Sequence, residues 1–155
     1  MKNWSSASAG LGLSLLLVSC SPLALKDVHF GWPVESVLTV NEQSRIEERR
    51  YSIVADLTPL AAEEFGDSTA LRGKEIRLLR GDTGYYFVTG KGFKHVYVFS
   101  PAEGELALTT TIPVSERGLA SPAMNQRPPY VELLEGKEMR LLLTPSGVTE
   151  EGDTQ

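Results

Sequence analysis

Short segments with strand character recur about every ten residues from residue 34 onward, and turn-forming residues separate them. The breaks at residues 81–84, 90–92 and 101–104 carry the Gly, Asp or Pro that hairpin turns require. Such regular spacing constrains the fold more than any other feature of the chain. It predicts an all-β fold, either a single antiparallel sandwich or a small barrel of about eight strands.

The first two strands are expected at residues 34–40 and 46–57, paired as a hairpin around the polar break 41–44. The later segments 85–89 and 94–100 are apolar on both faces, which predicts central strands that are covered on both sides. The other four strands are expected at residues 75–80, 105–113, 130–134 and 139–144.

One short helix is expected between the second and third strands. Thr58 is expected to cap it, Pro59 to occupy its first turn and Gly66 to end it. Residues 115–129 contain Gly and three Pro, which predicts a long loop that is either functional or disordered. Residues 147–155 are acidic and lack a large apolar side chain, so the globular domain is expected to span 34–146 and to end in a disordered acidic tail.

Charge and cysteine content exclude several classes of function. The net charge is −5, and Lys and Arg are not clustered, which argues against a nucleic-acid partner. Cys20 is the only cysteine, so the chain has no internal disulfide. The fold must therefore be held by packing and by backbone hydrogen bonds.

The N-terminus has the pattern of an export signal. Lys2 is followed by an apolar stretch of about 11 residues, which is too short to span a bilayer. Directly after this stretch come Leu17, Val18, Ser19, Cys20 and Ser21. The run from Leu17 to Cys20 resembles the lipobox of bacterial lipoproteins. An ordinary secretory signal is the alternative, but it favours small residues three positions and one position before the cut, and Leu17 stands at the first of these.

The lipoprotein resemblance implies a signal peptide at residues 1–19 and a lipidated tether at 20–33. It also implies a diacylglyceryl group on the Cys20 sulfur and an acyl group on the new amino terminus. Several acyl chains together make such an anchor effectively permanent. Ser21 implies sorting to the outer membrane, where the periplasmic face is expected rather than the cell surface.

The sequence does not predict a catalytic or metal site. Asp82 belongs to an Asp-Thr-Gly triplet that resembles that of aspartic proteases, and a dimeric hydrolase that uses Asp82 is one alternative. A turn in which Asp and Gly have only a conformational role explains the triplet more simply. Neither His29 nor His95 has a neighbour at metal-ligand spacing, so no metal and no further cofactor are expected.

The central strands concentrate aromatic residues, which indicates either the ordinary core of these strands or a binding face or cavity lining. We therefore expect a non-catalytic binding or structural module of the bacterial envelope, whose ligand or protein partner the sequence does not identify. The second alternative is a carrier of a small apolar ligand in a β-barrel cavity. The expected face comprises Tyr85, Tyr86, Phe93, Tyr97 and Phe99.

Overall fold

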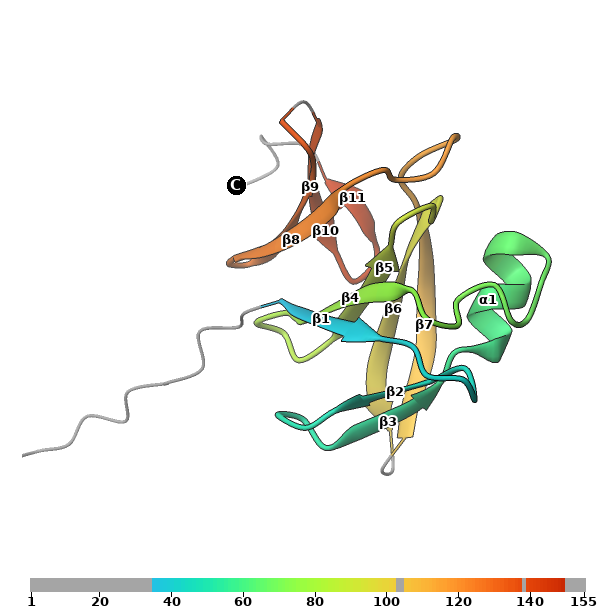
Figure 1. Ribbon diagram of the computed structural model, residues 1–155. Coiled ribbons are helices and arrows are strands. Elements are labelled where there is room, and N and C mark those ends of the chain that lie inside the picture. The colour runs from blue at the N-terminus through green and yellow to red at the C-terminus, as the bar shows by residue number, and fades with distance from the viewer. Residues whose placement is uncertain (1–34, 103–104, 138, 150–155) are drawn as a thin grey trace, which may run out of the picture. The chain divides into compact units, whose positions relative to one another are not determined.

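The computed structural model describes residues 35–102, 105–137 and 139–149, with the side chains of 139 and 140 excepted (Figure 1). The expected signal peptide, the tether with Cys20, and residues 150–155 lie outside this part of the chain. The fold is all-β with one short helix, as the spacing of turns predicted. Among the described residues there are eleven strands in three antiparallel sheets.

A five-stranded sheet lies at the centre, in the order β1-β4-β5-β6-β7. Successive side chains along each strand point to opposite faces of this sheet. Leu78, Tyr86 and Tyr97 therefore pack in the core on one face, and Leu79 and Phe87 pack in the core on the other. Every residue of β5 is buried, which confirms that this strand is covered on both sides. The five strands are β1 (Ser36–Thr39), β4 (Glu75–Arg80), β5 (Tyr86–Gly90), β6 (His95–Ala102) and β7 (Glu105–Pro113).

One face of the central sheet is covered by a hairpin and the helix. The hairpin consists of β2 (Arg45–Glu48) and β3 (Ile53–Asp56), and α1 (Thr58–Phe65) follows it (Figure 1). The helix buries Leu60 and Ala61 and ends at Gly66, whose φ of 71° is left-handed, as predicted.

The other face is covered by a four-stranded sheet in the order β11-β10-β9-β8. The two sheets bury an apolar core between them, which makes the fold sandwich-like. No sheet closes on itself among the described residues, so the barrel alternative is wrong. The four strands are β8 (Pro122–Arg127), β9 (Tyr130–Glu135), β10 (Met139–Thr144) and β11 (Gly147–Thr149).

One carboxylate at the start of β1 contacts both the central sheet and the four-stranded sheet. Glu35 Oε2 lies 2.5 Å from Nη1 of Arg77 in β4, and Glu35 Oε1 accepts the backbone N–H of Met124 in β8 at 2.8 Å.

The predicted first hairpin is wrong. β1 pairs with β4, and the predicted second strand, residues 46–57, folds back on itself as β2 and β3. The reversal occurs at residues 49–52, where two arginines are exposed and Ser52 adopts a φ of 54°. Local strand propensity predicted the extended segments but not the turn between them.

Three further predictions fail in detail. The 115–129 segment is not all loop, because Pro122–Arg127 forms β8. Gly147–Thr149 forms β11 and pairs with β10, so the folded domain extends beyond residue 146. Thr58 is not the N-cap: Leu57 occupies that position, and the Asp56 side chain accepts the Thr58 N–H at 2.8 Å.

Candidate functional site

An apolar groove of about 800 Å³ lies between the β2–β3 hairpin and the central sheet. The hairpin and the start of α1 form one wall, and β4 to β7 form the other. A pocket of this size and apolar character is typical of small-molecule sites. The hydrophobic lining comprises Ile46, Tyr51, Ile53, Val54, Ala55, Leu57, Leu60, Leu78, Tyr86, Val88, Phe99, Pro101, Ala102 and Leu106.

A pair of tyrosines marks one end of the groove. The Tyr51 and Tyr86 rings pack edge to face, with centroids 5.5 Å apart. A guanidinium group lies over each ring: Arg50 is 5.7 Å from the Tyr51 centroid, and Arg80 is 5.8 Å from the Tyr86 centroid. This end therefore combines aromatic surface with two cations.

The two arginines differ in their ion-pair partners. Arg50 pairs with Glu48 at 3.2 Å and also donates to the Ser36 hydroxyl. Burial acts to raise the pKa of Glu48, but hydrogen bonds from Ser36 and Arg50 outweigh it and hold this pKa below its ordinary value. No carboxylate forms an ion pair with Arg80 among the residues that the structure describes.

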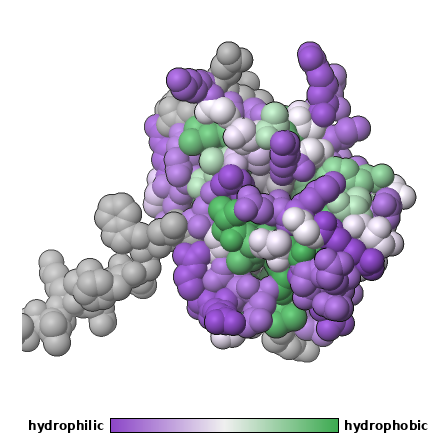
Figure 2. Space-filling model, in the orientation of Figure 1, coloured by the Kyte–Doolittle hydropathy of each residue, from purple (hydrophilic) through white to green (hydrophobic). Residues whose placement is uncertain are grey.

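The outer surface near the hairpin is also partly apolar. Figure 2 shows hydrophobic side chains over β1 and the β2–β3 hairpin, surrounded by hydrophilic ones. Val37 of β1 and Val54 of β3 are the large apolar residues most exposed there, at 48% and 69%. Single exposed valines are common on protein surfaces. The groove, to whose lining Val54 also belongs, is therefore the candidate ligand site rather than the outer surface alone.

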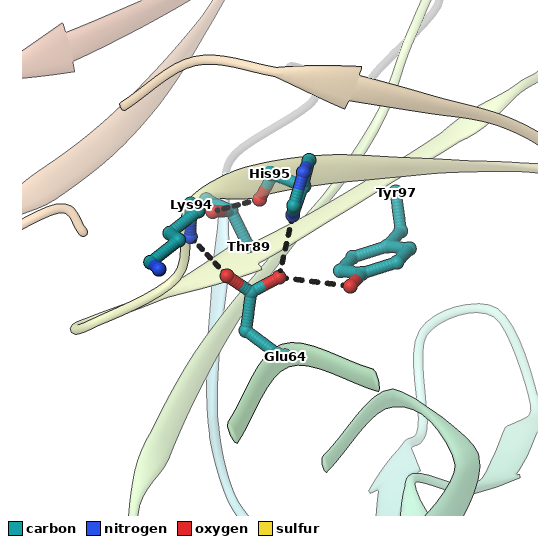
Figure 3. A network of polar contacts seen from close by, with 5 residues as sticks. All are labelled: Glu64, Thr89, Lys94, His95 and Tyr97. Atoms are coloured by element: carbon teal, nitrogen blue, oxygen red, sulfur yellow. Dashed lines mark hydrogen bonds and ion pairs between the residues drawn. The ribbon is translucent and has the colours of Figure 1, made fainter. Parts of the chain in front are cut away.

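A second constellation surrounds a buried carboxylate on α1 (Figure 3). The Glu64 side chain has no exposed area and accepts hydrogen bonds from the Tyr97 hydroxyl at 2.8 Å and from the Lys94 N–H. Its Oε2 lies 2.9 Å from His95 Nδ1. Burial, together with the hydrogen bond to Glu64, raises the pKa of Tyr97 well above its ordinary value, so this hydroxyl stays protonated.

The His95 side chain is one-third exposed and borders a shallow pocket of about 390 Å³ with Ser115 and Glu116. A histidine oriented by a carboxylate is a common element of hydrolase sites. Here the carboxylate also joins α1 to β6, so the network has a structural role whether or not His95 acts on a ligand. The sequence analysis missed Glu64 because 31 residues separate it from His95.

The predicted aromatic face is divided between several environments. Tyr86 and Phe99 line the groove, as a binding face requires. Phe93 and Tyr97 are fully buried in the same core, and their rings pack edge to face. Tyr85 packs against the core between the two large sheets, because neighbouring residues of a strand point to opposite faces. The five side chains therefore do not form one surface.

The other residues considered in the sequence analysis do not join either site. Asp82 is exposed in the turn between β4 and β5, whereas the hydrolase alternative requires a carboxylate in a cleft. Within the described ranges no three metal-binding side chains cluster. The only helix described there is too short to cross a membrane. Leu17, Val18, Ser19, Cys20 and Ser21 lie outside the described residues.

Fold and groove together define the chain as a sandwich-like all-β domain with an apolar groove. Comparison with protein-family models, with curated proteins and with solved structures finds no match. The residues of the groove and of the N-terminus therefore carry the functional argument.

Proposed function

We propose that the protein is a lipid-anchored, non-catalytic binding module on the periplasmic face of the bacterial outer membrane, and that the groove is its binding site. The single observation that carries the proposal is the apolar groove of about 800 Å³ between the β2–β3 hairpin and the central sheet. The lipobox-like run that ends at Cys20 supports the anchor.

The lining favours an apolar ligand on energetic grounds. Burial of apolar surface contributes about 25 cal/mol per Å². A ligand that buries roughly 300 Å² would gain about 7 kcal/mol before the costs of association are subtracted. The proposal includes a carrier of a small apolar ligand, with an open groove as the ligand site instead of a closed β-barrel cavity.

Binding is tested on residues 21–155, which include the whole described part of the chain. The neutral probe N-phenyl-1-naphthylamine is titrated into this protein, and its fluorescence rises when it enters an apolar site. Ala55→Trp places an indole in the groove and is expected to weaken probe binding at least about tenfold. The matched control Val148→Trp lies on β11 in the other sheet and is expected to have no effect. Equal probe binding by both variants would refute the groove as the site.

The anchor is tested separately in bacterial cells that express the full chain. Metabolic labelling with an alkyne fatty acid is expected to label the wild type and not Cys20→Ala. Membrane fractionation is expected to find the labelled protein with the outer membrane. Equal labelling of Cys20→Ala would refute lipidation at this residue.

A further inference from the structure

We propose that the groove binds a long-chain fatty acid, with its alkyl chain along the apolar lining and its carboxylate at Arg80. This inference rests on the proposed function, because both use the same groove. It adds the chemical class of the ligand and the residue that recognises its charged end.

The apolar part of the site extends from α1 to the tyrosine pair. Leu57 and Leu60 line the groove near the helix, and Tyr51 and Tyr86 line its other end. Val88 lies two residues beyond Tyr86 on the same face of β5, so the lining continues between the two ends. An elongated apolar surface of this kind fits an unbranched alkyl chain.

Arg80 is placed at the tyrosine end by the register of β4. It lies two residues after Leu78 on the same face of the strand, and Leu78 lines the groove. Arg80 is paired in register with Tyr86, and its guanidinium lies 5.8 Å from the Tyr86 centroid. The cation therefore lies beside an aromatic ring that lines the groove.

Among the charged residues around the groove, Arg80 is the one best suited to pair with an anion. Arg50, the other cation at this end, is already paired with Glu48. The charged residues of the lining itself, Asp56 and Glu105, are acidic and would repel an anion placed beside them. A ligand with one anionic group at the end of an apolar chain complements this arrangement, because guanidinium groups bind carboxylates well.

The test compares two ligands that share an alkyl chain and differ in charge. Laurate and 1-dodecanol are each titrated against bound N-phenyl-1-naphthylamine, and the ratio of their affinities is measured at low ionic strength. In the wild type, laurate is expected to bind about tenfold more tightly than 1-dodecanol. Arg80→Gln is expected to bring this ratio to about one, and Arg80→Lys to retain part of it.

Arg49→Gln is the matched control. This substitution also removes one positive charge, but from the turn between β2 and β3. There the Arg49 side chain is 88% exposed and pairs with Glu47. The ratio is expected to stay at its wild-type value in this variant. If Arg80→Gln leaves the ratio unchanged while both ligands still displace the probe, the fatty-acid inference is overturned and the proposed function stands. If the probe does not bind the wild type, both are overturned.

Discussion

Removal of the Glu64 carboxylate tests whether the network around it holds α1 on the central sheet. In Glu64→Ala the Tyr97 hydroxyl and the Lys94 N–H lose their acceptor, and His95 loses its carboxylate partner. Tyr97 is fully buried, so water does not readily replace the lost acceptor. The variant therefore leaves polar groups unsatisfied in the apolar core beneath the helix.

The expected cost follows from these contacts. A buried donor without a partner costs about 1–3 kcal/mol. We therefore expect Glu64→Ala to lower the free energy of unfolding by about 1–3 kcal/mol, measured by urea denaturation at neutral pH.

A second substitution separates the network from general damage to the helix. Tyr97→Phe alone is expected to cost about 1–2 kcal/mol, because it removes one hydrogen bond to the carboxylate. In the Glu64→Ala background the same change should cost less than about 0.5 kcal/mol, since its partner is absent. Glu63→Gln, on the exposed side of α1, is the control and should change stability little. A cost below about 1 kcal/mol for Glu64→Ala, or additive effects in the double variant, would refute the reasoning.

Two other predictions concern the backbone and the acid limit of stability. At Gly118 (φ +85°) a Cβ would lie 2.5 Å from the Gly92 carbonyl oxygen, so Gly118→Ala should lower stability in thermal unfolding by about 2–4 kcal/mol. Gly136→Ala, with a positive φ but open space around it, should cost only about 1–2 kcal/mol, and equal costs would contradict the clash. The pKa of Glu48 is lowered by its partners, so the stability that it contributes is present at neutral pH and is lost as the pH falls below about 4.5. Glu48→Gln should therefore flatten acid unfolding followed by circular dichroism, and an unchanged pH dependence relative to wild type would oppose this assignment.

Much of the strand content could be predicted because turn chemistry is local. The strands at residues 75–80, 105–113 and 139–144 have the predicted bounds, and each is bordered by residues that end strands. Pairing is not local, which is why β1 was assigned to the wrong neighbour. β8 carries Pro, Asn and Gln, and its pairing with β9 outweighs its weak strand propensity.

The candidate sites were less accessible to sequence reasoning. Alternation along the predicted strand 85–89 places Tyr85 and Tyr86 on opposite faces, and this signal could have divided the aromatic set in advance. The groove also depends on the position of the hairpin over the central sheet, which only the tertiary structure gives. Glu64 resembles any acidic residue of a surface helix until β6 is placed beside it.

The contacts of Glu35 have a mechanical consequence if Cys20 is anchored in the membrane as proposed. Tension that reaches β1 through the chain would load the contacts of Glu35, whose carboxylate joins β4 and β8. β1 continues from this point in a ladder of four residue pairs with β4. A pull along the axis of β1 would load these hydrogen bonds together in shear instead of opening them one after another. The domain would thus resist being peeled apart by its own tether.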